Sequence, residues 1–405
     1  MKYIVVLGDG MADRPMDSLG GRTPLEVAHK PGMDFLARHG SVGMVRTIPE
    51  GMPPGSDTAN LSVMGYAPRK YYSGRSPLEA VSMGVPLAED DVTFRMNLVT
   101  LSDASEFSEK TMVDYSAGEI STEESALLVR DLERRFGSAD MHIHAGISYR
   151  HCFVMHHALT GTALTPPHDI SGQKIGEYLP TGLYGRQLLS IMEAAHAFLK
   201  SHPVNLARQQ KGLHPANAVW FWGEGTKPML PDFEKTFGVK GGVICAVDLI
   251  KGIGGCAGMQ TPFVPGATGG MRTDFAAKGR AALQLLDDGC DLVYIHVEAP
   301  DESGHHGDVR CKIDAIEAID REILELLMAE LSARGEAYRI LLTPDHPTPI
   351  AIRTHTPDPV PFVLYDSTRD ASPCAETYSE RSAQATGQFL EEGPMLMQRL
   401  ISGNF

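Results

Sequence analysis

Hydrophobic runs near both ends of the chain predict buried strands. YIVVLGD occupies residues 3–9, and DLVYIHVEAPD (291–301) and YRILLTPDH (338–346) repeat its pattern of apolar residues followed by an aspartate. Such continuous runs are typical of strands that are covered on both faces of a parallel sheet. Residues 312–333 instead place apolar side chains every three or four positions, which predicts an amphipathic helix. Strands and helices that alternate in this way indicate an α/β fold.

The middle of the chain has a different pattern. Between about residues 76 and 240, short β-like runs such as VTFRMNLVTL and NAVWFWG are mixed with helical stretches such as STEESALLVRDLERRF. Glycines flank this region in YYSGRSP and FGVKGG, and glycines of this kind are common in linkers. We therefore expect residues 76–244 to form an inserted α+β domain. Residues 1–75 and 245–405 would together form the core.

Composition and charge limit the partners that the protein can have. The 405 residues are 42% hydrophobic and carry a formal net charge of −15, which repels nucleic acid and anionic membranes. An anionic substrate would need a local group of cations or metal ions. The opening MKYIVVLGDGM has an apolar run too short for a signal peptide or a membrane span. We expect a cytoplasmic protein that binds neither nucleic acid nor membrane, while the oligomeric state has no signal in the sequence.

Aspartates and histidines gather after the predicted strands. In open α/β sheets, ligands bind outside the carboxyl ends of the strands. Carboxylates and imidazoles together suit Mn²⁺ or Zn²⁺ better than Ca²⁺. Their number suits two divalent ions, the usual apparatus for phosphoryl transfer. The candidate ligands are Asp9, Asp301, His305, Asp345, His346 and His355.

Ser56 lies in GMPPGSDTANLSVMGY (51–66), directly after a Pro-Pro-Gly turn and at the predicted start of a helix. One interpretation is an N-cap, because serine often accepts a hydrogen bond from the N–H groups of the first turn. The other is a nucleophile whose phosphorylated form would be stabilised by those same N–H groups. The stretch alone favours the N-cap. The candidate metal ligands favour the nucleophile, since they give Ser56 a reason to be an alkoxide.

The order of these residues resembles that of the alkaline phosphatase superfamily. More specific stretches resemble the archaeal-type branch of the cofactor-independent phosphoglycerate mutases over nearly the whole chain, namely MKYIVVLGDGMADRP, PPGSDTANLSVMGY, YSGRSPLEA, AGISYRH, PANAVWFWGEG, VDLIKGIG, VPGATG and EAPDESGHHGD. The resemblance implies an alkaline-phosphatase-like, doubly wound sheet core with an inserted α+β cap domain.

The resemblance also implies a metal site and a reaction. One metal ion would be held by Asp301, His305 and His355, and the other by Asp9, Ser56, Asp345 and His346. The ions would be Mn²⁺ or Zn²⁺, with Co²⁺ a further option, and 2,3-bisphosphoglycerate would not be needed. Ser56 would take the phosphate of 3-phosphoglycerate and return it to give 2-phosphoglycerate, an isomerase step of glycolysis that passes through phosphoserine.

Cations are required to hold the carboxylate and phosphate of such a substrate. Arginine suits this role because its planar guanidinium group binds these anions through two hydrogen bonds. Arg150 is our first choice and Arg95 the second. Lys251 resembles the family's core lysine near the transferred phosphate. We therefore expect Ser56, Lys251 and Arg150 to be the catalytic residues. His151 is a further candidate for substrate binding or proton transfer. For each of these residues a purely structural or surface role is the alternative.

Two other functions remain open at the level of sequence. A homoserine kinase-like phosphotransferase would use ATP, but the chain has no GxxxxGK[ST] loop, and GIGGCAG (252–258) does not fit that pattern. A metal-binding homologue without catalytic activity is the second alternative. The complete set of candidate ligands, together with Ser56, argues against it.

Overall fold

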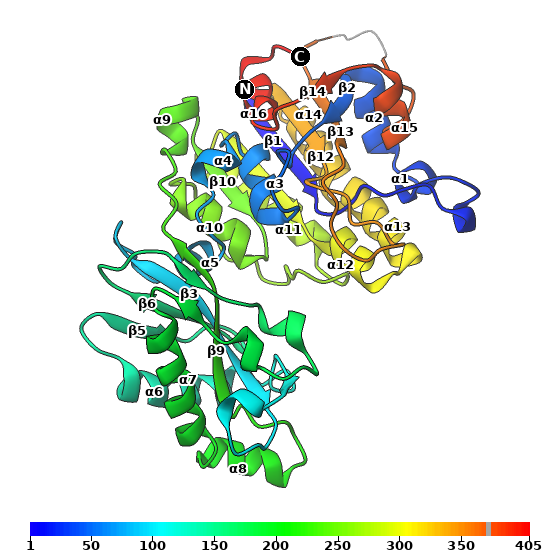
Figure 1. Ribbon diagram of the computed structural model, residues 1–405. Coiled ribbons are helices and arrows are strands. Elements are labelled where there is room, and N and C mark those ends of the chain that lie inside the picture. Colours follow the sequence, from blue (N-terminus) through cyan, green and yellow to red (C-terminus); the bar gives the residue numbers. More distant parts are fainter. Residues whose placement is uncertain (370–373) are drawn as a thin grey trace. The chain divides into compact units, whose positions relative to one another are not determined.

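The computed structural model describes residues 1–369 and 374–405. These residues form two compact units (Figure 1). Unit 1 consists of Met1–Tyr72 and Met229–Phe405, and unit 2 of Ser73–Pro228. Within the described ranges, every helix is too short or too polar to cross a lipid bilayer.

A seven-stranded mixed sheet forms the centre of unit 1, in the order β10-β11-β1-β12-β13-β2-β14. The first four strands are parallel, whereas β13 is antiparallel to both of its neighbours. The three strands predicted from the apolar runs are therefore present as β11, β1 and β12. The strands are β1 (Lys2–Gly8), β2 (Ser41–Val45), β10 (Gly241–Ile244), β11 (Leu292–Val297), β12 (Tyr338–Thr343), β13 (Val360–Asp366) and β14 (Phe389–Leu390).

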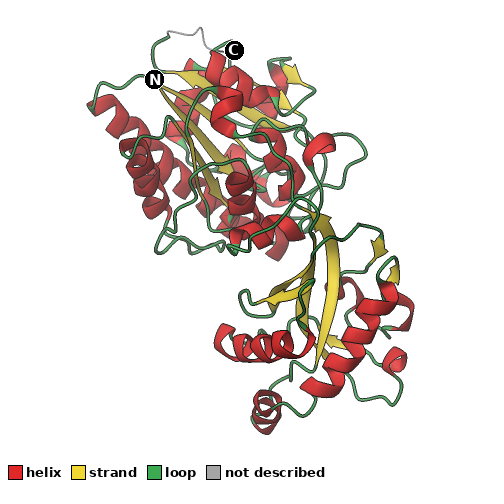
Figure 2. Ribbon diagram, turned by 90° about the vertical axis from the view of Figure 1, so that its left-hand side faces the viewer, coloured by secondary structure: helices red, strands yellow, loops and turns green. Residues whose placement is uncertain are grey.

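Helices cover both faces of this sheet (Figure 2). Both chain termini lie at the same end of unit 1 (Figures 1 and 2). The helices are α1 (Pro24–Val27), α2 (Pro31–His39), α3 (Ser56–Val63), α4 (Pro68–Tyr71), α9 (Phe233–Phe237), α10 (Asp248–Cys256), α11 (Phe275–Asp287), α12 (Ala299–His306), α13 (Val309–Ala318), α14 (Glu325–Ala333), α15 (Glu380–Ala385) and α16 (Met395–Ser402).

The helix predicted over 312–333 is confirmed, although it begins earlier and is less regular than expected. It runs from α13 into α14 through a π-helical turn, Ile319–Leu324. In that turn Asp320 accepts hydrogen bonds from the N–H groups of Gly32 and Met33, at 3.0 and 2.6 Å. The carboxylate thereby caps α2, whose own N-cap residue supplies no side-chain bond. The apolar spacing predicted the helix but contained no signal for the π turn.

Unit 2 is an α+β unit with a core of its own. Its five-stranded antiparallel sheet has the order β4-β3-β6-β5, with β9 also paired to β3. Phe94, Phe153 and Phe221 are buried on one face beneath α6 and α7. The elements are β3 (Val92–Leu101), β4 (Met112–Asp114), β5 (Met141–His144), β6 (Arg150–Met155), β7 (Thr162–Ala163), β8 (Thr181–Gly182), β9 (Ala218–Thr226), α5 (Ser76–Ser82), α6 (Thr122–Phe136), α7 (Gly185–Leu199) and α8 (Pro203–Gln210).

The boundaries of the two units differ from the predicted ones, most clearly at residues 229–244, which were assigned to the inserted domain. The glycines of FGVKGG indicated a linker, but Gly241 and Gly242 begin β10, which pairs with β11 in the sheet of unit 1. A Cβ atom at Gly241 would lie 2.5 Å from the Met259 side chain, and one at Gly242 would lie 2.6 Å from Leu285. These glycines therefore allow close packing in the core.

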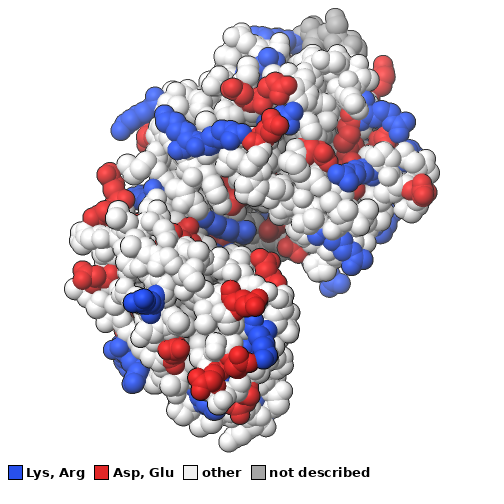
Figure 3. All heavy atoms as spheres, viewed as in Figure 1, with Lys and Arg blue, Asp and Glu red and all other residues white. Residues whose placement is uncertain are grey.

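Charged side chains of both signs are mixed on the surface. On the face shown in Figure 3, side chains of Lys and Arg and side chains of Asp and Glu are both present on each of the two units. Attraction of an anionic substrate must therefore come from particular clusters of residues, as the net charge of −15 also indicates.

Candidate active site

Three neighbouring parallel strands bring the candidate ligands to one edge of the sheet in unit 1. Asp9 directly follows β1, and Asp345 lies two residues after β12. Asp301 is in the first turn of α12, which follows β11. The strands are in register, because Gly8 pairs with Val297. Their carboxyl ends therefore meet, as the apolar runs and terminal aspartates predicted.

Asp301, His305 and His355 form the first group of donors. His305 Nε2 lies 3.2 Å from Asp301 Oδ2 and 3.0 Å from His355 Nε2. His355 Nε2 lies 3.4 Å from Asp301 Oδ1. Asp301 and His305 face the same side of α12 because they are four residues apart on one helix. The three side chains thus converge, although His355 comes from a loop far along the chain.

Asp9, Ser56, Asp345 and His346 form the second group. His346 Nε2 lies 3.5 Å from Asp9 Oδ1 and 3.4 Å from Asp345 Oδ2. Ser56 Oγ lies 3.4 Å from Asp9 Oδ2 and 3.2 Å from His346 Nε2. Ligands at about 2.0–2.1 Å around a tetrahedral ion are about 3.4 Å from one another. The spacing of both groups therefore fits the coordination of divalent ions.

Burial and charge also fit a pair of cations. Asp9, Asp345 and His346 are at most 1% exposed, and their donor atoms lie within 4.8 Å of one another. Burial, together with the negative charges of Asp345, Asp301 and Glu298, raises the pKa of Asp9 well above its usual value. Asp9 Oδ1 has no hydrogen-bond partner among the described residues. Carboxylates buried this closely are unfavourable unless a cation compensates their charge.

Ser56 is the first residue of α3, and Gly55 occupies the N-cap position. The Ser56 side chain makes no capping bond, so the N-cap interpretation of this residue is wrong. Its Oγ instead points toward Asp9 and His346. Within the first turn of α3, it is Asp57 that accepts a backbone hydrogen bond, from the N–H of Thr58 to its Oδ1 at 2.8 Å.

Asn60, which the sequence patterns did not indicate, links the helix of Ser56 to the ligands. Its Nδ2 donates to the carbonyl of Ser56 at 2.8 Å and to Asp345 Oδ2 at 2.9 Å. Tyr294 donates its hydroxyl to Asn60 Oδ1 at 2.7 Å. Asn60 lies four residues after Ser56 and hence on the same side of α3. That spacing is the signal by which the sequence could have indicated it.

The loop after β1 requires a glycine. The N–H of Gly10 donates to Asp345 Oδ1 at 3.1 Å, and the φ angle of this residue is +60°. A Cβ atom at this position would lie 2.6 Å from Asp301 Oδ1 and 2.5 Å from Thr348 Oγ1. The Gly-Asp-Gly sequence thus brings the backbone close enough to hold Asp345 in place.

A buried lysine joins two of the loops that carry ligands. Lys312 Nζ donates to Asp13 Oδ2 at 2.7 Å and to the carbonyl of Thr348 at 2.9 Å. Thr348 in turn donates its hydroxyl to Asp301 Oδ1. Lys312 is fully buried, so this network ties the loops after β1 and β12 to α13.

In unit 2, Arg95 and Arg150 share one face of the sheet. Arg95 pairs with Cys152, which lies two residues after Arg150 on β6. The Arg95 guanidinium is 3.9 Å from the centre of the Trp222 ring, and its Nε is 2.8 Å from Glu79 Oε2. Burial, reinforced by the charges of neighbouring arginines, lowers the pKa of Arg95 to about 10. Arg150 is exposed, so its guanidinium group is accessible to an anion.

His151 does not lie on that face. Successive residues of a strand point to opposite sides, and His151 is buried on the side of the unit 2 core. Its Nδ1 accepts the N–H of Gly146 at 3.1 Å, and burial lowers its pKa to about 3. These observations favour the structural alternative for His151, and its part in substrate binding or proton transfer stays a prediction.

Lys251 lies on α10 in unit 1, a helix that packs against α3. Its side chain is 22% exposed, and Nζ is 4.0 Å from Asp248 Oδ1. A weak pair at this distance leaves the ammonium group available for an anion. The role suggested for Lys251 stays a prediction.

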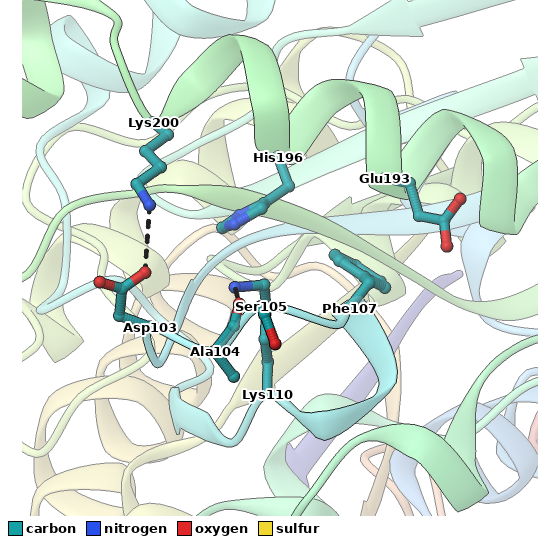
Figure 4. Close-up of a pocket in the computed structure, with 8 residues that line it drawn as sticks. All are labelled: Asp103, Ala104, Ser105, Phe107, Lys110, Glu193, His196 and Lys200. Atoms are coloured by element: carbon teal, nitrogen blue, oxygen red, sulfur yellow. Dashed lines mark hydrogen bonds and ion pairs between the residues drawn. The ribbon is translucent and has the colours of Figure 1, made fainter.

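A hollow of about 530 Å³ in unit 2 contains none of the predicted site residues (Figure 4). Its basic groups already have partners: Lys200 Nζ lies 3.0 Å from Asp103 Oδ1, and Lys110 Nζ donates to the carbonyl of Ala104 at 2.6 Å. This hollow is therefore a poor candidate for binding a substrate that carries a carboxylate and a phosphate.

Comparisons with known proteins identify the family. The sequence model of 2,3-bisphosphoglycerate-independent phosphoglycerate mutase matches residues 37–205. A protein of that name from Methanothrix thermoacetophila is 50% identical, with 100% of both chains covered. One from Geobacter sulfurreducens, named as probable, is 47% identical over 99% of this chain and 100% of its own. The chain belongs to this family.

Two solved structures have folds similar to that of this chain. A protein from Pyrococcus horikoshii matches with a TM-score of 0.81 at 30% identity, covering 99% of this chain and 97% of its own. A cofactor-independent phosphoglycerate mutase from Thermoplasma acidophilum matches with a TM-score of 0.68 at 24% identity, covering 100% of both chains. The kinase and inactive-homologue alternatives gain no support from these relatives.

Proposed function

We propose that this member of the family interconverts 3-phosphoglycerate and 2-phosphoglycerate without 2,3-bisphosphoglycerate, and that Ser56 carries the phosphate between the two positions. The observation that carries the proposal is the position of Ser56 Oγ, 3.4 Å from Asp9 and 3.2 Å from His346, at the start of α3. Full-length relatives that bear this name support the substrate class.

Two divalent ions complete the proposed site. Asp301, His305 and His355 would hold one, and Asp9, Ser56, Asp345 and His346 the other. When bound, Mn²⁺, Zn²⁺ or Co²⁺ would supply positive charge that favours the serine alkoxide and compensates the charge of the phosphoryl group. The mixture of imidazole, carboxylate and hydroxyl donors supports these ions over Ca²⁺.

The chain itself positions the nucleophile. In the first transfer, a bond forms between Ser56 Oγ and phosphorus, the bond from phosphorus to the 3-oxygen of the substrate breaks, and glycerate takes up the proton that the serine loses. In the return transfer, a bond forms between the 2-oxygen of glycerate and phosphorus, the bond from phosphorus to Ser56 Oγ breaks, and Ser56 takes up the proton that the 2-hydroxyl loses. The N–H groups and dipole at the start of α3 favour the negative charge of phosphoserine.

Cationic side chains would bind the rest of the substrate. We assign Arg150 and Arg95 to the carboxylate and phosphate of phosphoglycerate, because both lie on one face of the unit 2 sheet and a guanidinium group binds such anions through two hydrogen bonds. Lys251 would bind the same anions as a point charge. Retention of glycerate between the two transfers is essential, since water would otherwise hydrolyse phosphoserine.

A labelling experiment tests the proposal. Metal-loaded protein is incubated with 3-phosphoglycerate that is labelled in its phosphate, then quenched in acid and digested. Label is expected on the peptide that contains Ser56 and in 2-phosphoglycerate, with no requirement for ATP or 2,3-bisphosphoglycerate. Wild-type protein that forms no 2-phosphoglycerate but phosphorylates homoserine from ATP would show that the proposal is wrong.

A further inference from the structure

His296, which is not among the residues predicted from the sequence, is a fully buried histidine beside the candidate ligands. Its Nε2 lies 2.9 Å from Asp9 Oδ2. Among the described residues, neither ring nitrogen has a partner that meets the geometry of a hydrogen bond. An imidazole buried in this way is costly unless at least one of its nitrogens is bonded. The carboxylate of Asp9 is the acceptor within reach.

The register of the sheet explains this contact. His296 on β11 pairs with Leu7 on β1, and paired residues of adjacent strands point to the same side. Asp9, two residues after Leu7, continues on that side. The N–H of Asp9 donates to the carbonyl of Val297 at 2.9 Å, so the pairing extends beyond the end of β1. Tyr294, two residues before His296, reaches Asn60 of α3, which shows that this is the side of Ser56.

A second buried group holds His296 in place. Lys278 of α11 is fully buried and donates its Nζ to the carbonyl of His296 at 3.0 Å. The backbone of His296 is therefore anchored by the β ladder and by this lysine. A ring attached to such a rigid backbone can hold a carboxylate in one orientation.

We propose that His296 is a positioning residue for Asp9, an inference that rests on the proposed metal site. After a small rotation of the ring its Nε2–H would donate to Asp9 Oδ2, 2.9 Å away, and would fix the carboxylate with Oδ1 facing His346, whose Nε2 is 3.5 Å away. Asp9 Oδ1 is the oxygen without a hydrogen bond, as expected for an oxygen reserved for a cation. Hydrogen bonds that orient a metal ligand are commonly worth 10- to 100-fold in metal affinity.

Variants of the full-length protein test this role. His296→Leu removes the donor at similar volume, whereas His296→Gln keeps an amide N–H near the position of Nε2. Ile295→Val is the matched control, since Ile295 is fully buried on the same strand but points to the other side of the sheet. Each protein is freed of metal, checked for folding by circular dichroism, and titrated with Mn²⁺ by calorimetry.

His296→Leu should weaken one of the Mn²⁺ binding steps by about 10- to 100-fold, while His296→Gln and Ile295→Val stay close to wild type. Turnover of His296→Leu should recover as the Mn²⁺ concentration is raised, which a damaged fold would not allow. Equal Mn²⁺ affinity in His296→Leu and wild type, or a loss that His296→Gln shares, would overturn the positioning role alone. Wild-type protein that binds no divalent ion would overturn both the positioning role of His296 and the proposed function.

Discussion

Ser56 Oγ lies 3.2 Å from His346 Nε2, although the two residues are 290 positions apart. One comes from the start of α3 and the other from the loop after β12. Their proximity depends on the order of the strands and on the helix that follows the Pro-Pro-Gly turn. It also distinguishes Ser56 from the other serine hydroxyl of the same helix.

Replacement of Ser56 by alanine should therefore abolish turnover and leave the fold intact. A reaction that passes through a covalent intermediate loses its route when the nucleophile is removed, and we expect kcat to fall at least about 1,000-fold. Ser62→Ala is the matched control on α3, because the Ser62 hydroxyl donates to the carbonyl of Thr47 at 2.5 Å rather than to the side chain of a candidate ligand. Conversion of 3-phosphoglycerate measures both variants. Comparable rates in Ser56→Ala and Ser62→Ala would contradict the assignment of the nucleophile.

The sequence predicted the ligand positions because one simple rule applied to them. Asp9, Asp301 and Asp345 each follow a long apolar run, and parallel strands place such residues together. His296 and Asn60 escaped prediction for a related reason. His296 is inside an apolar run, where it was interpreted only as part of a strand, and Asn60 is within a helix. Their roles depend on which neighbouring element each side chain faces, and that follows from the register of the sheet and the packing of α3.

Removal of metal should abolish activity and lower thermal stability. Without cations the buried carboxylates of Asp9, Asp301 and Asp345 repel one another, so chelation leaves a less stable core. Ligands that bind only the folded state raise its stability by about 2.7 kcal/mol at 100 times their Kd. Activity and the midpoint of thermal unfolding should both recover when Mn²⁺, Co²⁺ or Zn²⁺ is added. Full activity in a sample shown by elemental analysis to be metal-free would exclude the two-metal site.

Arg150→Ala should weaken substrate binding without changing the metal content. Hydrogen bonds to charged groups contribute about 1.5–3 kcal/mol, which corresponds to a loss of about 10- to 150-fold in kcat/KM. Arg130→Ala is the matched control, since Arg130 is another exposed arginine of unit 2 and pairs with Asp131. Steady-state kinetics with 3-phosphoglycerate compares the two variants, and elemental analysis checks the metal. An unchanged kcat/KM in Arg150→Ala would remove this residue from the substrate site.

In unit 2, the sequence patterns predicted strands but not the side of the sheet on which each side chain lies. The β-like runs VTFRMNLVTL and NAVWFWG predicted β3 and β9, but His151 was grouped with Arg150 only because the two are adjacent. Alternation along β6 places them on opposite faces, one exposed and one in the core. Similarly, the glycines before Val243 were interpreted as a linker because a tightly packed edge strand and a hinge both require small residues.

The pair of His157 and Asp90 provides a pH-dependent test at the surface of unit 2. Their Nδ1 and Oδ2 atoms are 2.5 Å apart, and the hydrogen bond and negative charge of Asp90 raise the pKa of His157 above 6.5. A raised pKa means that the pair stabilises the fold fully below pH 6.5, and that this stabilisation is lost as the pH rises through the folded-state pKa. Titration followed by NMR should show a lower pKa for His157 in Asp90→Asn than in wild type, because the hydrogen bond and charge of Asp90 are the largest causes of the raised pKa. Identical titration curves for the two proteins would contradict the pairing.

The buried pair of Lys312 and Asp13 should contribute far more to stability than an exposed pair of the same kind. Both side chains are at most 1% exposed, and their atoms are 2.7 Å apart. Lys312→Met leaves Asp13 buried without a counter-charge, which should lower the free energy of unfolding by about 3–5 kcal/mol. Arg14→Ala is the control, because Arg14 and Asp358 are 3.0 Å apart but more than half exposed, so that the loss of this pair should cost less than about 1 kcal/mol.

Urea denaturation of metal-free proteins measures both changes. The double variant Lys312→Met with Asp13→Asn should regain part of the loss, since it removes the unpaired charge. Equal destabilisation by Lys312→Met and Arg14→Ala would show that the buried network does not hold the loops of the site.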